Sequence, residues 1–275
     1  MNKIKFTKMQ AEGNDFIIID NRRGIVKKRN IRDFVRKMCR RRFSVGADGL
    51  ILIENSKKAD FKWHYHNPDG NEVEMCGNGS RCAARFAYLN GITGKKLSLE
   101  TLAGIINAGV KGNMVKVELT KPHGLMMGFK IPIDGKNYEM NFLNTGVPHV
   151  VYFSDDLDKL DVIRIGRKTR YHKLFAPSGT NTNFVKILGS HSLSIRTYER
   201  GVEDETLACG TGAVASSLIA GVLGKVKSPV SVKTRGGKTL KVCFKWNGME
   251  FSDVFLEGET RVVYTGELVK EALAD

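Results

Sequence analysis

Short runs of apolar and β-branched residues, separated by glycine-containing turns, dominate the chain and predict strands. In the first part, strands are expected at residues 4–6, 16–20, 50–53, 61–66, 97–101, 104–111 and 114–119. Between residues 31 and 41 the apolar positions recur at i, i+3, i+4, i+7 and i+8, which predicts one amphipathic helix. Because the turns between strands are short, most strand pairs should be antiparallel.

The second part of the chain repeats this order of elements. Strands are expected at residues 150–153, 183–187, 192–198, 230–234, 239–245 and 250–257. Predicted helices at residues 80–90 and 212–223 each follow a Cys-Gly-x-Gly turn and stop at a glycine. Residues 213–223 are apolar or small on every face of the helix, so this helix must be buried all round. We therefore expect a sheet wrapped around a central helix.

An internal repeat spans nearly the whole chain. Cys209 lies 133 positions after Cys76, and the same offset pairs other residues: Gly13 with Gly146, Glu72 with Glu205, Gly91 with Gly224, Thr101 with Thr234, and Gly104 with Gly237. The repeat predicts an α/β (α+β) fold of two homologous, pseudo-symmetric lobes that face each other. We place the N-terminal lobe at residues 1–121 and the C-terminal lobe at 122–262, with the tail 263–275 able to rejoin the first lobe.

Composition and charge change this picture little. The 275 residues are 41% hydrophobic and 27% charged, which is ordinary for a globular protein. The net charge of +15 suggests an anionic partner. However, the basic residues of the densest cluster, residues 27–42, fit the solvent-exposed face of the predicted helix. We expect no nucleic-acid partner. The longest nearly apolar stretch is too short to span a membrane, and the N-terminus has no signal-peptide core, so we expect a cytoplasmic protein.

Five cysteines raise the question of what each thiol does. No C-x-x-C pair exists, so neither a structural zinc site nor a disulfide framework is expected, and Cys39, Cys82 and Cys243 are interpreted as core residues. Cys76 and Cys209 instead occupy equivalent helix starts, where backbone N–H groups favour a thiolate and bind anions. Two such thiols flanking one anionic substrate could invert a carbon centre by acid–base chemistry, without metal or cofactor. The alternative is that each of these cysteines is only a small buried residue that fits a tight turn at the start of a helix. The occurrence of the same motif at equivalent positions in both halves favours a catalytic role.

Several longer motifs support this interpretation. They cover residues 8–16, 46–51, 67–82 (NPDGNEVEMCGNGSRC), 146–149, 179–184 and 199–212 (ERGVEDETLACGTG). With these motifs the chain resembles the diaminopimelate epimerase family of cofactor-independent amino-acid racemases. The resemblance implies an isomerase that interconverts LL- and meso-diaminopimelate in lysine and peptidoglycan-precursor biosynthesis. It also implies a two-lobed α/β fold, no pyridoxal phosphate or metal, and a homodimer.

The resemblance also implies roles for individual residues. Cys76 corresponds to the proton donor and Cys209 to the proton acceptor. The substrate-binding residues it implies are Asn14, Asn67, Gly77, Asn78, Asn181, Glu199, Arg200, Gly210 and Thr211. His149 and Glu199 correspond to residues that tune the pKa of the two thiols.

Two positions depart from the family pattern, and two other functions stay open. Many members have asparagine at the position of Val147, and some have glutamine at that of Gly49, so recognition of the distal end of the substrate can differ here. A racemase of proline or hydroxyproline would also use two cysteines, but Asn67, Asn181 and Arg200 favour a substrate with a distal charged group. A nucleic-acid-binding protein on a degenerate enzyme fold is the third hypothesis.

Overall fold

A computed structural model describes residues 4–274 of the chain and divides it into two compact units. Unit 1 holds the described residues up to Glu118 together with those from Gly258 onward, and unit 2 is Leu119–Glu257. The boundaries therefore lie after residues 118 and 257, where the sequence placed them after 121 and 262.

Unit 1 is a sheet whose strands follow the order β18-β1-β2-β3-β4-β6-β7-β8, with the short β5 added to β4. The β2/β3 and β4/β6 pairs are parallel and the other pairs are antiparallel. The strands are β1 (Ile4–Ala11), β2 (Asn14–Asp20), β3 (Gly49–Glu54), β4 (Phe61–His66), β5 (Glu72–Val73), β6 (Lys96–Thr101), β7 (Gly104–Lys111), β8 (Met114–Glu118) and β18 (Arg261–Leu268).

Unit 2 repeats this strand order and these pairing directions, in the order β9-β10-β11-β12-β13-β15-β16-β17, with β14 added to β13. Its parallel pairs, β11/β12 and β13/β15, are the counterparts of those in unit 1. The two units differ at one edge strand, since β9 precedes β10 in the chain whereas β18 comes from the end of the chain. The strands are β9 (His123–Ile133), β10 (Lys136–Asn144), β11 (Pro148–Phe153), β12 (Asn181–Gly189), β13 (Ser192–Glu199), β14 (Asp204–Thr206), β15 (Val230–Lys233), β16 (Thr239–Trp246) and β17 (Phe251–Glu259).

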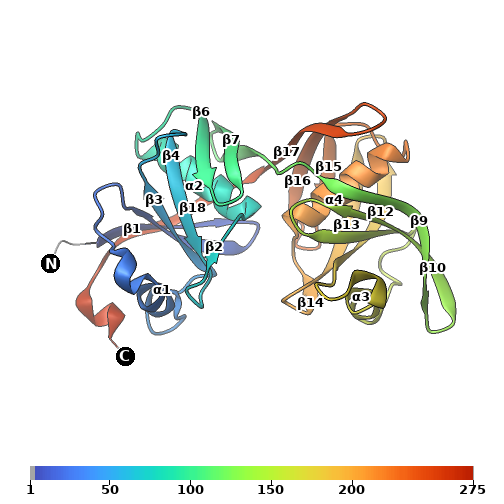
Figure 1. The fold of residues 1–275 in the computed structure, drawn as a ribbon, viewed down its shortest axis with the longest axis horizontal. Coiled ribbons are helices and arrows are strands. Elements are labelled where there is room, and N and C mark those ends of the chain that lie inside the picture. Colours follow the sequence, from blue (N-terminus) through green and yellow to red (C-terminus); the bar gives the residue numbers. More distant parts are fainter. Residues whose placement is uncertain (1–3, 275) are drawn as a thin grey trace. The chain divides into compact units, whose positions relative to one another are not determined.

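Each sheet wraps around one buried helix, as the sequence predicted (Figure 1). In unit 1 this helix is α2 (Gly77–Leu89), and in unit 2 it is α4 (Gly210–Val222), so that the two helices are 133 positions apart at both ends. Alanine, glycine and serine line much of α4, which lets the strands approach it from several sides. Nine consecutive residues of α4, from Gly212 to Ala220, are buried.

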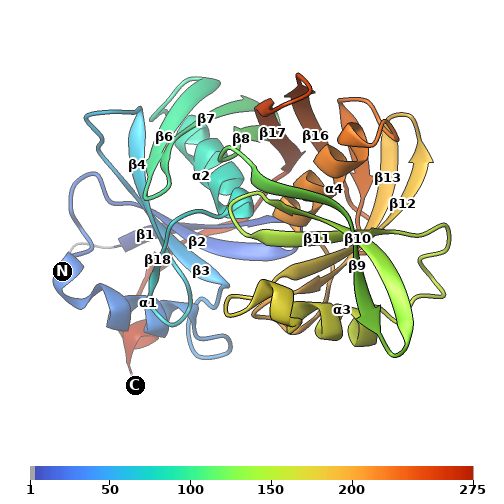
Figure 2. The same ribbon diagram turned by 45° about the vertical axis from the view of Figure 1, so that its right-hand side comes forward.

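A second helix covers the other face of each sheet (Figure 2). In unit 1, Val35, Met38 and Cys39 of α1 (Ile31–Cys39) pack with residues of β2 and β3. In unit 2, Val162 and Ile165 of α3 (Val162–Arg170) belong to the corresponding cluster. The central strands are therefore buried on both faces, which explains their continuous apolar runs. Three short 3₁₀ helices, Lys28–Asn30, Lys173–Phe175 and Lys270–Leu273, complete the described elements.

Several elements were not predicted from the sequence: the β9–β10 hairpin, α3, β18 and the short strands β5 and β14. Gly124, Gly128 and Pro132, residue types that are uncommon inside strands, lie on the exposed face of β9, and Gly166 is a poor helix former within α3. Glycine is needed at residue 166 because a Cβ there would lie 2.4 Å from the side chain of Tyr198. In the part of the chain that the structure describes, no helix is long and apolar enough to cross a membrane.

Candidate active site

Cys76 is the N-cap of α2, directly before Gly77, and its sulfur contacts groups of two kinds. Its backbone is extended (φ −146°, ψ 117°), and Sγ accepts a hydrogen bond from the Gly79 N–H at 3.4 Å. The carbonyl oxygen of the Asn14 side chain lies 3.9 Å from Sγ, where it can accept the thiol proton. The sulfur therefore contacts a donor that favours the thiolate and an acceptor that favours the thiol.

The first turn of α2 is held by a fully buried arginine. Arg81 donates a hydrogen bond from Nη2 to Oδ1 of Asn78 at 2.7 Å and from Nη1 to the carbonyl of Gly77 at 3.4 Å. The Nε atom of Arg81 is buried with no hydrogen-bond partner, and burial lowers the pKa of the Arg81 guanidinium. The guanidinium thus fixes the Asn78 side chain, and leaves the backbone N–H groups at the helix start to face a ligand.

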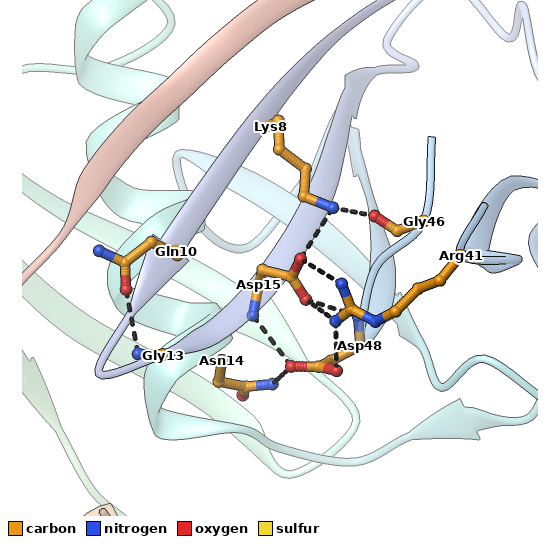
Figure 3. Close-up of polar contacts among 8 residues, drawn as sticks. All are labelled: Lys8, Gln10, Gly13, Asn14, Asp15, Arg41, Gly46 and Asp48. Atoms are coloured by element: carbon orange, nitrogen blue, oxygen red, sulfur yellow. Dashed lines mark hydrogen bonds and ion pairs between the residues drawn. The ribbon is translucent and has the colours of Figure 1, made fainter. Parts of the chain in front are cut away.

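Asn14 and Asn67 are each held by a neighbouring side chain. Asn14 donates from Nδ2 to Oδ2 of Asp48 at 2.9 Å, as Figure 3 shows. Asn67 directly follows β4, and its Oδ1 accepts a hydrogen bond from the Tyr65 hydroxyl at 3.1 Å. The same tyrosine ring closes the space at Gly49, where a Cβ would lie 2.4 Å from the ring. A longer side chain at residue 49 would therefore displace Tyr65, which gives the glycine at this position a structural reason.

In unit 2, Cys209 begins α4 and is almost fully buried. Burial, followed by the negative charge of Glu199, raises the pKa of the Cys209 thiol to about 12. The Thr211 hydroxyl, at 3.6 Å from Sγ, and the backbone N–H groups of Thr211 and Gly212 act in the opposite direction. Glycine is required at residue 212, because a Cβ there would lie 2.3 Å from Oδ1 of Asn183.

Glu199 and His149 lie in the interior of unit 2. Burial raises the pKa of Glu199, whose carboxylate accepts a hydrogen bond from the Thr206 hydroxyl at 2.9 Å. Burial and then the charge of Arg200 lower the pKa of His149 to about 3, so the imidazole is neutral. Its Nδ1 lies 3.1 Å from Nδ2 of Asn183, and its Nε2 is buried without a partner.

Asn181 and Arg200 are joined through the backbone. Oδ1 of Asn181 accepts a hydrogen bond from the Arg200 N–H at 2.8 Å, and its Nδ2 donates to the carbonyl of Pro148 at 3.2 Å. The Arg200 side chain donates from Nη1 to the carbonyl of Ser178 at 3.2 Å. The remaining guanidinium donors suit a carboxylate, which an arginine binds with two parallel hydrogen bonds.

The expected site residues thus form two groups, one in each unit. Cys76, Gly77, Asn78 and Asn14 lie together in unit 1, with Asn67 held through Tyr65. In unit 2, Cys209 is linked to Thr211 and Glu199, and Arg200 is linked to His149 and Asn181, by the contacts and charges given above. Gly210 directly follows Cys209 at the start of α4. Of the three cysteines interpreted as core residues, Cys39 and Cys82 are buried, whereas Cys243 is only half-buried.

Three residues that hold the side chains of the candidate site in position were not predicted from the sequence: Asp48, Arg81 and Asn183. The signal for Asn183 was available, because it lies two positions after Asn181 in a strand, so that both asparagines share one face. Arg81 could also have been found, because it lies three and four positions after its partners Asn78 and Gly77 on one helix. Asp48 acts through a contact with Asn14, 34 residues away, that no local pattern reveals. Within residues 4–274, no group of three or more His, Cys, Asp and Glu side chains is placed to hold a metal ion.

The fold is that of known racemases, isomerases and related proteins. A phenazine biosynthesis protein of the PhzF family from Bacillus anthracis aligns with a TM-score of 0.74 and 18% identity, over 98% of this chain and 100% of that one. A probable proline racemase from Agrobacterium radiobacter aligns with a TM-score of 0.69 and 13% identity, over 97% of this chain and 93% of that one. These likenesses define a two-lobed fold class, and the expected fold is confirmed.

Sequence comparison identifies the family within this class. The family model for diaminopimelate epimerase matches residues 6–124 and 141–263. The diaminopimelate epimerase of Aquifex aeolicus is 47% identical over 98% of this chain and 99% of its own length. That of a Hydrogenobaculum species is 48% identical over 96% of this chain and 98% of its own length. The chain belongs to the diaminopimelate epimerase family, a family of isomerases, and the resemblance seen in its motifs is confirmed.

Proposed function

We propose that this protein epimerises LL-diaminopimelate to meso-diaminopimelate in lysine and peptidoglycan-precursor biosynthesis, with Cys76 as proton donor and Cys209 as proton acceptor. Family membership over nearly the whole chain supports the reaction. One observation carries the mechanism: each unit begins its central helix with a cysteine, at positions 133 residues apart. A pair of equivalent thiols suits a reaction that removes a proton from one face of a carbon and delivers another to the opposite face.

The helix starts supply the groups that such a reaction needs. Backbone N–H groups at Gly77 and Asn78, and at Gly210 and Thr211, belong to the first turns of α2 and α4, where the helix itself offers them no acceptor. They bind the carboxylate next to the reacting carbon and stabilise the negative charge that develops when its proton leaves. Arg200, Asn181, Asn67 and Asn14 bind the distal end of the substrate in this proposal.

Cys209 must lose its proton before it can act as a base. The structure gives this thiol a raised pKa through burial and Glu199. The ammonium group of a bound amino acid brings a positive charge that lowers this pKa, and the N–H groups of Thr211 and Gly212 add to the effect. We infer that substrate binding creates the thiolate. His149, being neutral, contributes a hydrogen-bond donor rather than a charge.

The test is the purified protein with LL-diaminopimelate, followed by separation of the stereoisomers by chiral chromatography. Formation of meso-diaminopimelate to equilibrium, without added cofactor or metal, is the expected result. Racemisation of proline or hydroxyproline with no action on diaminopimelate would replace the proposal by its closest alternative. Salt-sensitive DNA binding with no isomerase activity would instead support the third hypothesis.

By the same resemblance, we propose that the protein acts as a homodimer in the cytoplasm and takes no nucleic-acid partner. Size-exclusion chromatography with light scattering should then give about twice the 30.6 kDa mass of one chain. A monomer of full activity would contradict the dimer proposal.

A further inference from the structure

A network of charged side chains lies behind Asn14 in unit 1 (Figure 3). Arg41 forms ion pairs with Oδ1 of Asp15 at 2.6 Å and with Oδ1 of Asp48 at 2.9 Å. The nearly buried Lys8 pairs with Oδ2 of Asp15 at 2.9 Å and also donates to the carbonyl of Gly46. Although burial opposes ionisation, the hydrogen bonds from Arg41 and Lys8 hold the pKa of Asp15 at about 2. Asp15 is therefore ionised at neutral pH and anchors Arg41 and Lys8 on either side of its carboxylate.

Asp48 uses this anchorage to fix the orientation of the Asn14 amide. Its Oδ2 accepts hydrogen bonds from Nδ2 of Asn14 at 2.9 Å and from the backbone N–H of Asp15 at 3.1 Å. A carboxylate only accepts hydrogen bonds, so the NH₂ end of the Asn14 amide must face Asp48. The oxygen end then faces away from Asp48, and it is this oxygen that lies 3.9 Å from Sγ of Cys76.

We propose that Asp48 is a positioning residue that orients the Asn14 amide so that its oxygen accepts the thiol proton of Cys76 and keeps this cysteine in its proton-donating form. With the amide reversed, Nδ2 would approach the sulfur instead. The sulfur would then be near two donors, the amide and the Gly79 N–H, and both would favour the thiolate. The orientation set by Asp48 thus decides which protonation state of Cys76 is preferred.

The second half of the chain has no counterpart of the Asn14 amide beside its cysteine. The repeat offset places Val147 at the position that corresponds to Asn14, and a valine side chain offers no hydrogen-bond acceptor. Cys209 instead contacts the Thr211 hydroxyl, which can donate or accept. The two thiols are therefore given different surroundings by substitutions at two positions of the repeat, Asn14 against Val147 and Asn78 against Thr211. This inference rests on the proposed function only in assigning the donor role to Cys76.

The test measures the thiol of Cys76 directly and needs no substrate. In the full-length protein, the alkylation rate of Cys76 by iodoacetamide is followed against pH, with the modified peptides quantified by mass spectrometry. Asp48→Ala releases the Asn14 amide, and the alkylation midpoint should fall by about half to one pH unit. The peptide that contains Cys209 lies in the other unit and serves as an internal control, since its alkylation profile should not move.

Asp48→Asn separates the orientation of the amide from the loss of a negative charge. The backbone N–H of Asp15 still requires an oxygen at the place of Oδ2, so the new amide keeps its oxygen toward Asn14 while the charge is lost. The midpoint for Cys76 in this variant should stay close to that of the wild type. Other titratable groups that interact with Cys76, including Tyr65 of β4 and Arg81 and Cys82 of α2, are the same in every variant.

Two results would overturn the proposal. One is an unshifted midpoint in Asp48→Ala, with folding checked by circular dichroism. The other is an equal shift in Asp48→Asn, which would assign the effect to charge. If Asp48→Ala does not fold, Asn14→Leu removes the acceptor directly, and its midpoint should fall as well; no shift there also refutes the proposal. Epimerase activity of the wild type is assayed separately, so failure of the proposed function is distinguished from failure of this inference.

Discussion

The side-chain amide of Asn183 donates a hydrogen bond to Nδ1 of His149 at 3.1 Å in the interior of unit 2. The assignment of donor and acceptor is supported by the other contacts of Asn183: its Nδ2 also donates to the carbonyl of Val150 at 2.9 Å, and its Oδ1 accepts from the Thr197 hydroxyl at 3.0 Å. His149 therefore carries its ring proton on Nε2, which is buried and has no protein partner. A buried donor without a partner is costly, and substrate or water at the site would satisfy it.

The neutral state of His149 predicts a specific loss of stability in acid. Its pKa is about 3 in the folded protein and 6.5 in the unfolded chain, so the unfolded state binds more protons between these values. The free energy of unfolding should fall as pH drops below about 6.5, by on the order of 1 kcal/mol per pH unit from this one group. Urea unfolding of the wild type and of His149→Gln at about pH 7 and about pH 5 measures it. The variant should lose less stability over this interval, and equal losses would show that His149 is not buried as a neutral ring.

Exchanging the partner of His149 should exchange its tautomer. In Asn183→Asp a carboxylate faces Nδ1, which must then carry a proton, and the negative charge raises the pKa of the imidazole. Long-range ¹H–¹⁵N spectra should show the Nε2–H tautomer in the wild type and a protonated Nδ1 in the variant. Asn183→Leu, which has a similar shape but no polar group, is the matched control. A wild-type spectrum with the proton on Nδ1 would contradict the assignment.

Much of this fold could be predicted from local patterns. The Cys-Gly-x-Gly motifs located α2 and α4, although these helices begin inside the motifs, at Gly77 and Gly210, rather than at residues 80 and 212. The absence of a polar face predicted the burial of α4. The β9–β10 hairpin was not predicted because the glycines and the proline on the exposed face of β9 are residue types that rarely occur inside strands. Strand β18 escaped because it joins β1, at the far end of the sequence. A pattern within a short window carries no information on such a pairing.

The residues of the candidate site likewise divide into those that local patterns predict and those that they do not. Residues inside the repeated motifs, such as Cys76 and Cys209, could be selected from sequence. Asp48 could not, because its role is set by Asn14, 34 residues away. The position of Asn183 beside Asn181 on one strand face was a signal, but its role depends on His149, also 34 residues away. Tertiary contacts of this kind decide the orientation of an amide or the tautomer of a ring, which the residue type alone leaves open.

The close approach at Gly212 predicts that even a methyl group will disturb the site. In Gly212→Ala the new Cβ would lie 2.3 Å from Oδ1 of Asn183 and 3.3 Å from Sγ of Cys209. Displacing these groups should cost about 1–3 kcal/mol of stability and strongly reduce turnover. Thermal unfolding and the epimerase assay measure the two effects. Gly109→Ala is the control, since nothing lies within 4 Å of its Cβ position, and wild-type behaviour of Gly212→Ala would refute the packing argument.

Arg200 is expected to bind the distal carboxylate of the substrate. Arg200→Lys keeps the charge and the backbone hydrogen bond to Asn181 but removes the planar pair of donors. Losing one charge-assisted hydrogen bond should lower kcat/KM by roughly ten- to a hundredfold. Steady-state kinetics with LL-diaminopimelate measures this, with the exposed Arg23→Lys as a control that should not change. An unaltered kcat/KM would assign Arg200 to the protein surface rather than to the substrate.

The origin of the proton delivered to the product tests the division of labour between Cys76 and Cys209. In D₂O at low conversion, the product should carry deuterium at the inverted carbon, while recovered substrate stays largely protiated, because the two protons travel through different thiols. A single base serving both faces could return the original proton to the product.

Cys76→Ala and Cys209→Ala should each lower net inversion by at least about a hundredfold, since one face then lacks its acid or base. The variant that keeps the thiolate can still exchange the proton of the one stereoisomer it faces, without inverting it. Cys243→Ala, at the half-buried cysteine of β16, is the matched control and should keep full activity. Near-normal inversion by either of the first two variants would show that Cys76 and Cys209 are not a catalytic pair.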